Sequence, residues 1–280
     1  MNTADGVDLH AHSHCSDGAL SPAQLVERAA GAGVRLLALT DHDTIEGLGE
    51  ARTAALVHGI ELVDGVEISA AWRAQTIHVL GLWIDAGDAA LRAQLELQVQ
   101  RRQRRLEDIC ARLNKVRLPG ELLLQAVQRR RGVPTRTHLA AAMVEAGLVK
   151  SPQDAFHRYL GHGKPGYRSA PWPALAEVVD WIRAAGGQAV LAHPMRYRVS
   201  SGARRQLIAD FAGHGGAALE VITGNASGQP VDTVADLAAK HALAGTVGSD
   251  FHDPNLPWNP LGRLAKLPAR VRPLWDRAKN

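Results

Sequence analysis

Short apolar segments, each the length of a buried strand, alternate with helical segments along most of the chain, and this alternation constrains the fold more than any other feature. Repeated βα units of this kind favour a parallel sheet, either open or closed into a barrel. The third segment, residues 60–69, is expected to break at a turn at Gly65. We count seven strand units, at residues 7–10, 34–40, 60–69, 76–84, 188–192, 218–222 and 243–247.

Helical segments fill the intervals between these strands. The first, over residues 21–32, has Ser21 at its N-cap and Pro22 at its first position. A second is expected from Thr44 to His58. The regular alternation stops at residue 88, where one long helix to residue 113 is followed by shorter helical pieces to about residue 167. It resumes after residue 173, so the interruption is predicted to be an inserted helical subdomain.

Polar side chains that bind metals collect at one end of the predicted strands. In parallel α/β folds the carboxyl ends of strands converge on one face, so residues far apart in sequence can meet there. The alternative, scattered buried histidines that hydrogen-bond to backbone carbonyls, predicts no preference for one strand end. His78 lies inside a strand, and the residues at or just past strand ends are His10, His12, His42, Glu67, His193, Asp250 and His252.

The first of these strand ends carries His10 and His12, which lie on the same side of an extended segment because strand side chains alternate. Two such imidazoles can reach one metal ion, and Asp17 on the following turn can serve a second ion. Taken alone, this pair is equally compatible with histidines that make ordinary hydrogen bonds. Cys15 is interpreted as structural.

The composition favours a globular protein with a sizeable core. Of 280 residues, 46% are hydrophobic, and no run of about 18 apolar residues exists. Residues 1–5 lack the basic and apolar parts of a signal peptide, and the two cysteines, Cys15 and Cys110, fit a reducing compartment. We therefore expect a soluble cytoplasmic protein with no membrane association and no obligate protein partner.

Basic charge is concentrated in the predicted insertion. Residues 97–168 contain 15 lysines and arginines against 5 acidic residues, whereas the net charge of the whole chain is +4. The rest of the chain is therefore negative, which suggests anion capture beside a metal site. The chain has no GxxxxGK[ST] motif and no convincing GxGxxG motif, so nucleoside triphosphate hydrolysis and dinucleotide redox chemistry are poorly supported.

Six short motifs follow one another along the chain, namely His10-Ala11-His12, Ser16-Asp17-Gly18, Thr40-Asp41-His42-Asp43, Gly65-Val66-Glu67, Ala192-His193-Pro194 and Gly248-Ser249-Asp250-Phe251-His252. In this order they resemble the motifs of the polymerase and histidinol phosphatase (PHP) metal-dependent hydrolases. The resemblance covers nearly the whole chain outside the insertion, and the insertion resembles that of the 3',5'-nucleotide bisphosphate phosphatases, whose relatives trim RNA from the 5' end. It implies an α/β fold, a distorted (β/α)7 barrel of the PHP type with an inserted helical subdomain. The barrel is assigned residues 1–97 and 169–280, and the substrate-binding insertion residues 98–168.

The resemblance also implies three divalent metal ions, usually manganese, iron or zinc. It assigns His10, His12 and Asp250 to a first ion and places Glu67 between this ion and a second. His78 and His193 complete the second site, while Asp17, His42 and His252 hold the third ion. Six imidazoles and three carboxylates suit these metals better than magnesium or calcium, which prefer oxygen ligands, but they do not select among the three.

The insertion is expected to select the substrate. Arg102 and Arg105 are three residues apart on a predicted helix and share a face, and Arg136 and His138 follow on a turn after Pro134. Guanidinium groups bind phosphate oxygens in pairs, so this cluster, with Lys164, is predicted to hold a second, non-reacting phosphate. Arg129 to Arg131 are interpreted as a solvated helix face.

The reaction implied is hydrolysis of the 3'-phosphate of a nucleoside 3',5'-bisphosphate to give the 5'-monophosphate, by attack of a metal-bridging hydroxide on phosphorus. His10, His12, Glu67, His193 and Asp250 are expected to carry this chemistry through the metals. One alternative is a 5'-to-3' exoribonuclease on short 5'-phosphorylated RNA. Another is a nucleic-acid-binding module with a vestigial metal site. The sequence does not decide the native metal, the base preference, the oligomeric state or the acid that protonates the leaving group.

Overall fold

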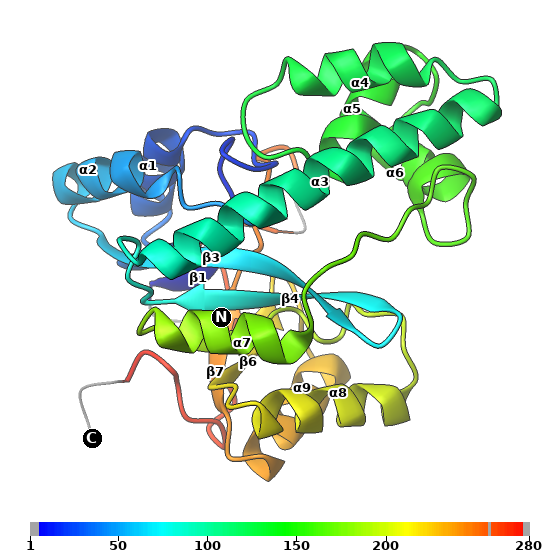
Figure 1. Cartoon of the computed structure of the whole chain (residues 1–280). Helices are drawn as coiled ribbons and strands as arrows, with labels where there is room; N and C mark the ends of the chain where they lie inside the picture. The colour runs from blue at the N-terminus through cyan, green and yellow to red at the C-terminus, as the bar shows by residue number, and fades with distance from the viewer. Residues whose placement is uncertain (1–5, 257–258, 277–280) are drawn as a thin grey trace.

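Seven strands form one sheet that curls into a nearly closed barrel in the computed structural model of the chain, which describes residues 6–256 and 259–276 (Figure 1). Residues 1–5, which the sequence predicts to lack a signal peptide, lie outside the described residues. The strands are ordered in space as they are in sequence. They are β1 (Val7–Ala11), β2 (Leu36–Leu39), β3 (Glu61–Trp72), β4 (Gln75–Leu82), β5 (Gln188–Leu191), β6 (Ala218–Thr223) and β7 (Ala244–Gly248).

The sheet is parallel except around β4, which runs antiparallel to both β3 and β5. The first and last strands approach each other through their C-terminal ends. The Asp250 amide donates to the His10 carbonyl at 2.8 Å, and the His12 amide donates to the Phe251 carbonyl at 2.9 Å. These bonds bring residue 10 beside residue 250, which confirms the predicted α/β barrel and gathers its strand ends at one face.

The expected break at Gly65 is wrong, because β3 continues through this residue to Trp72. A Cβ atom at Gly65 would lie 2.8 Å from both the Leu39 carbonyl oxygen and the Thr40 methyl group, so glycine allows the end of β2 to pass close to the strand. Glu67 consequently lies in the middle of β3 rather than at the end of a strand.

The helices that cover the barrel largely follow the sequence prediction. They are α1 (Pro22–Gly31), α2 (Leu48–His58), α7 (Leu175–Ala184), α8 (Ser201–Gly213) and α9 (Gln229–Lys240). Ser21 caps α1 as predicted and forms a capping box with Gln24. The second helix begins at Leu48, not Thr44, because Asp43 takes a left-handed backbone conformation with φ 51° and a turn follows it.

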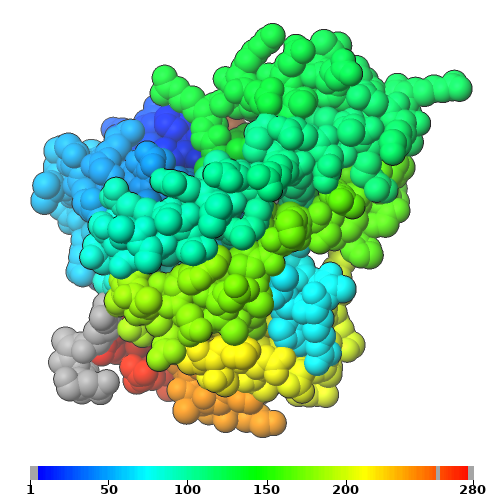
Figure 2. Space-filling model, in the orientation of Figure 1, coloured from blue at the N-terminus to red at the C-terminus, as the bar shows by residue number. Residues whose placement is uncertain are grey.

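The helical insertion projects from the barrel and has an apolar cluster of its own (Figures 1 and 2). It contains α3 (Ala89–Lys115), α4 (Gly120–Gln128), α5 (Arg136–Glu145), α6 (Pro152–Ala155) and the π-helix η1 (Phe156–Leu160). Leu91 and Leu95, in the first half of α3, pack in the barrel core, whereas Leu113 packs against Leu139 and its neighbours in the insertion. Helix α3 therefore belongs to both regions and joins them as one continuous helix. No helix among the described residues is long and apolar enough to span a membrane.

Candidate metal centre

The imidazoles of His10, in β1, and His12, just after β1, meet two carboxylates, one from β3 and one from the loop after β7. His10 and His12 are fully buried, with their Nε2 atoms 3.1 Å apart. Both Nε2 atoms lie 3.2–3.3 Å from Oε2 of Glu67 and 3.2–3.4 Å from Oδ1 of Asp250. These four groups lie close enough together to bind a single ion.

A second group forms beside the first, around Asp17. Nε2 of His252 lies 3.3 Å from Oδ1 of Asp17, and Nε2 of His42 lies 3.9 Å from the same oxygen. His12 completes this group and so borders both sites. The loop after β1 therefore supplies ligands to two neighbouring positions, as its sequence predicts.

Glu67 is the centre of a third group, which includes His42 and His78, and His193 lies beside this group in contact with Glu67. Oε1 of Glu67 lies 2.9 Å from Nδ1 of His78 and 3.0 Å from Nε2 of His193. Its Oε2 lies 3.0 Å from Nδ1 of His42, so His42 faces this group as well as Asp17. All nine predicted ligands thus lie around one centre. His42 is expected to serve only the position around Asp17, but it also faces the group around Glu67.

Buried polar atoms without hydrogen-bond partners show that the centre fits metal ions. Such atoms cost free energy unless a ligand satisfies them. Within the described part of the chain, the buried side-chain atoms that make no hydrogen bond include Asp17 Oδ1, His42 Nδ1, Glu67 Oε2, His78 Nδ1 and His193 Nδ1. Mixed imidazole and carboxylate donors of this kind are typical ligands of divalent transition metals.

The charges of the centre are strongly coupled. Burial opposes ionisation of Glu67, but the imidazoles of His42, His78 and His10 outweigh it and hold the pKa of the carboxyl well below its usual range. Burial likewise opposes a charged His10, yet Glu220, Glu67 and Asp250 raise the pKa of its imidazole well above the ordinary value. The carboxylates therefore stay ionised and attract positive charge, which a bound cation supplies.

Sequence reasoning missed several residues that hold the ligands in place. Asp41 accepts hydrogen bonds from Ser13 and Ser16 and so fixes the loop that carries Asp17. The Tyr197 hydroxyl accepts from the His78 amide at 2.9 Å and donates to the Ala192 carbonyl at the same distance. Arg196 pairs with Asp250. Glu220 could have been found, because a lone acidic residue in the apolar strand segment 218–222 is unusual.

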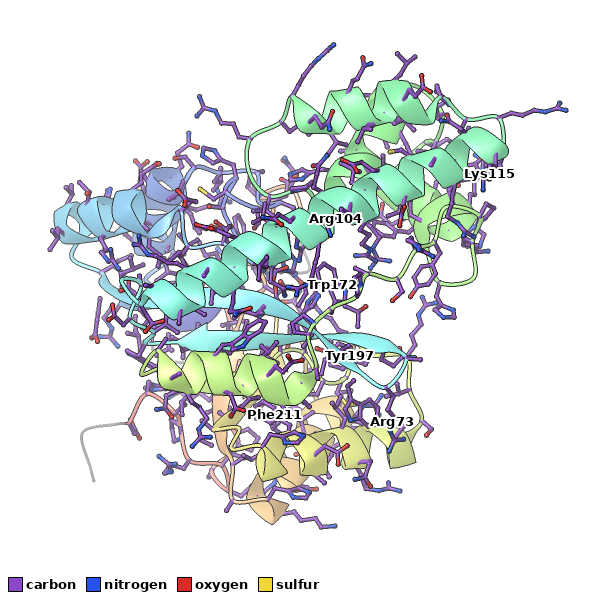
Figure 3. The ribbon with its side chains drawn as sticks, in the orientation of Figure 1. Arg73, Arg104, Lys115, Trp172, Tyr197 and Phe211 are labelled. Atoms are coloured by element: carbon purple, nitrogen blue, oxygen red, sulfur yellow. The ribbon has the colours of Figure 1, made fainter. Side chains whose placement is uncertain are left out.

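The predicted substrate arginines lie on the insertion, above the barrel. Burial and the guanidinium groups of Arg136 and Arg102 lower the pKa of Arg105 to about 9. No carboxylate among the described residues pairs with Arg105, whose Nε donates to the Arg168 carbonyl. The Trp172 ring lies 5.5 Å from the guanidinium of Arg102 and 5.7 Å from that of Arg105. Its buried Nε1 makes no hydrogen bond within the described residues. Figure 3 shows Trp172 beneath α3.

Arg102 differs from the other two arginines because the protein itself satisfies it. The side chain is 6% exposed, and its Nε donates to Oδ2 of the fully buried Asp43 at 2.6 Å. Its Nη2 donates to the Ser69 hydroxyl at 2.9 Å. By contrast, Arg105 and Arg136 donate to the backbone carbonyls of Arg168 and Leu160.

His138 connects the arginine cluster with the metal centre. It lies in the first turn of α5, not on a turn before it, and its Nδ1 accepts from the Thr135 amide at 3.3 Å in a capping box. Burial lowers the pKa of its imidazole, while the charge of Asp17 partly offsets this effect. Lys164 is half-buried in the loop after η1, where its amide donates to the Gly161 carbonyl.

Comparison with known proteins agrees with this geometry. The model of the PHP domain matches residues 8–132. The 3',5'-nucleoside bisphosphate phosphatase of Chromobacterium violaceum is 40% identical over 96% of this chain and 95% of its own length. The 5'-3' exoribonuclease Rnm of Escherichia coli K12 is 42% identical over 96% of this chain and 92% of its own. A C. violaceum amidohydrolase, solved with bound sulfate and no metal, superposes with a TM-score of 0.90 at 40% identity and covers 97% of this chain and 95% of its own.

Proposed function

The chain belongs to the PHP domain family of metal-dependent phosphoesterases, and we propose that it removes the 3'-phosphate from nucleoside 3',5'-bisphosphates to leave the 5'-monophosphate. The observation that carries this proposal is the pairing of two different anion sites. One is the nine-residue centre around Glu67, and the other is the arginine cluster of the insertion. A substrate with two phosphates would occupy both.

The metal centre would act on the reacting phosphate. We propose that three divalent ions, manganese, iron or zinc, are held there by the nine predicted ligands. Bound ions of this kind act as Lewis acids toward phosphoryl oxygens and lower the pKa of water to near neutrality. Glu67 contributes most to their placement, since its two oxygens face five imidazoles. These five are His10, His12, His42, His78 and His193.

The insertion would bind the phosphate that does not react. Within the described part of the chain, Arg105 and Arg136 have no carboxylate partner and donate to backbone carbonyls. Free guanidinium groups bind phosphate in a bidentate manner. Arg102 adds positive charge but is itself held by Asp43. We include His138 and Lys164 in the proposed substrate site. Because α3 belongs to both regions, the spacing between the two phosphate sites is fixed by the fold.

A 5'-to-3' exoribonuclease is the second candidate, favoured by the 42% identity to Rnm. The two functions share the 5'-phosphate anchor and differ in the scissile group, a monoester in one and a diester in the other. Manganese-loaded protein is assayed with adenosine 3',5'-bisphosphate and with a 5'-phosphorylated dinucleotide. Faster turnover of the bisphosphate supports the proposal, and faster turnover of the dinucleotide overturns it in favour of the nuclease.

A non-catalytic nucleic-acid-binding function is separated from both by His193→Ala. The proposed hydrolase loses phosphate release in this variant, because His193 contacts Glu67 at the metal centre. A binding module with a vestigial metal site would instead show salt-sensitive binding to long polynucleotides that the variant leaves unchanged.

A further inference from the structure

Glu220 is a buried carboxylate behind the metal centre and is not one of the nine predicted ligands. It lies on β6 with 1% of its surface exposed, among the apolar side chains of Leu219, Val221 and Ile222. An ionised group in such a place costs several kcal/mol unless its oxygens are fully hydrogen-bonded. Both of its oxygens accept hydrogen bonds from residues of the centre or from their immediate neighbours.

The first oxygen controls which nitrogen of His10 faces the metals. Oε1 of Glu220 lies 2.8 Å from Nδ1 of His10, so this nitrogen carries the proton and donates it to the carboxylate. This leaves Nε2 of the same ring, which lies 3.3 Å from Glu67 and 3.4 Å from Asp250, as the nitrogen whose lone pair a bound metal ion would use. A carboxylate behind a metal-binding histidine fixes its tautomer and orientation in this way.

The second oxygen holds His193, a predicted ligand on a different strand. Oε2 accepts from the His193 amide at 2.6 Å and from the Thr223 hydroxyl at 2.9 Å. His193 has φ 32° and precedes Pro194, a combination that the chain adopts at a cost. The strong bond from its amide to a carboxylate stabilises this conformation and turns the ring toward Glu67.

The packing of β7 leaves room for this arrangement. A Cβ atom at Gly248 would lie 2.5 Å from Oε1 of Glu220 and 2.3 Å from Cβ of His10. The glycine therefore lets the β7 backbone pass against the hydrogen-bonded pair. We propose that Glu220 is a positioning residue that sets, through one carboxylate, both the tautomer of His10 and the backbone of His193. This proposal rests on the metal centre of the proposed function.

Glutamine cannot replace Glu220 in this role, although it has the same shape. Three donors converge on the two oxygens, namely His10 Nδ1, the His193 amide and the Thr223 hydroxyl. An amide offers one oxygen and one NH2 group, so its NH2 must face a donor. If the NH2 faces His10, the ring adopts the opposite tautomer, and Nε2 loses the lone pair that binds metal.

The test measures metal binding directly. Native protein, Glu220→Gln and the control Thr223→Val are loaded with zinc, dialysed against a graded chelator and analysed for metal per chain. Thr223→Val keeps the carboxylate and both of its bonds to the centre. We expect Glu220→Gln to bind at least one ion about 10–100-fold more weakly than native protein, and Thr223→Val to match native protein. Circular dichroism verifies that both variants fold.

A second readout follows His10 itself. In zinc-loaded, [15N]histidine-labelled native protein, Nδ1 of His10 should show the downfield proton of a charge-assisted hydrogen bond, and Glu220→Gln should lose this signal. Unchanged metal affinity together with an unchanged signal overturns the positioning role. Native protein that binds no metal contradicts the metal centre and this role together. Native protein that binds metal but hydrolyses no phosphoester contradicts the proposed function and leaves the role of Glu220 supported.

Discussion

The barrel and the insertion both contain clusters of charged side chains, but the cluster in the barrel favours cations and the cluster in the insertion favours anions. At one end of the barrel, carboxylates and imidazoles lie around Glu67, and several of their buried polar atoms make no hydrogen bond and can bind cations. In the insertion, the guanidinium groups of Arg105 and Arg136 line one cavity, no carboxylate of the described residues pairs with them, and they can bind an anion. One site favours cations and the other favours anions, and α3 joins the two regions. This arrangement suits the proposed substrate, which has one phosphate for the metal ions and another for the arginines.

The two regions meet at the buried pair between Arg102 and Asp43. Asp43 follows the predicted ligand His42 in the barrel, and Arg102 is on the insertion helix α3. Gln98, also on α3, donates to Oδ1 of Asp43 at 3.1 Å. The molecule therefore has three parts, the metal centre, the arginine cluster and this joint between them. A single substitution can alter each part separately.

Removing the charge of Glu67 should have the largest effect, because this carboxylate faces five imidazoles of the metal centre. We expect Glu67→Gln to lower phosphate release by about 10³-fold or more, since several kcal/mol of transition-state stabilisation come from the metals. Steady-state kinetics at saturating manganese, together with metal analysis, measures this loss. Activity within tenfold of native protein would contradict the placement of Glu67 at the centre.

Breaking the joint should destabilise the protein. Arg102→Met leaves Asp43 buried and unpaired, which should lower the free energy of unfolding by about 3–5 kcal/mol. The matched control is Arg130→Met, which removes an exposed pair with Glu145 and should cost no more than about 1 kcal/mol. Denaturant unfolding of both variants provides the measurement. Equal losses in the two variants would show that the joint is not buried as described.

Removing one arginine of the cluster should weaken substrate binding while the metal chemistry persists. Arg105→Ala should raise KM for adenosine 3',5'-bisphosphate about 10–100-fold, the effect of one lost charge-assisted hydrogen bond. Arg104→Ala, an exposed neighbour on the same helix (Figure 3), serves as the control and should leave KM unchanged. The two-site comparison fails if both variants behave alike, or if Arg105→Ala lowers kcat and leaves KM unaffected.

Metal affinity should rise with pH, and this effect, counted per pH unit, is the smallest of the four. Burial acts to lower the pKa of His252, but Asp17 and Asp250 outweigh it and raise the pKa to about 10 in the metal-free protein. Below this pH the imidazole must lose a proton before it binds an ion, so affinity should increase about tenfold per pH unit for each proton released. Calorimetry in buffers of different ionisation enthalpy counts these protons. A metal affinity that is independent of pH between 6 and 9 would contradict the raised pKa of His252 beside Asp17 and Asp250.

The sequence predicts the barrel well because apolar strand segments and helix caps are local signals. Ser21 and Gln24 specify the start of α1, and the seven strand segments appear where the apolar runs lie. The continuation of β3 through Gly65 could not be predicted, since it depends on a close approach of β2 to this glycine. The reversal of β4 depends likewise on how the strands pair, and not on any local pattern.

The metal centre could be predicted residue by residue, whereas its surroundings could not. Eight of the nine predicted ligands lie in short motifs that the sequence displays directly, and His78 lies inside a strand. The structure brings all nine together around Glu67. Glu220, Tyr197 and Arg196 act from other segments, and their contacts arise from the closure of the barrel. Arg102 illustrates the same limit, because its pairing with Asp43 joins residues 59 positions apart.

The central claim, that one region takes the reacting phosphate and the other an anchoring phosphate, is tested most directly by substrate comparison. We would measure kcat/KM of the manganese-loaded native protein for adenosine 3',5'-bisphosphate and for adenosine 3'-monophosphate, which lacks the 5'-phosphate. The two-site arrangement predicts that kcat/KM falls by about 10²-fold or more for the monophosphate, since a bidentate guanidinium contact is lost. Equal values for the two substrates would contradict it.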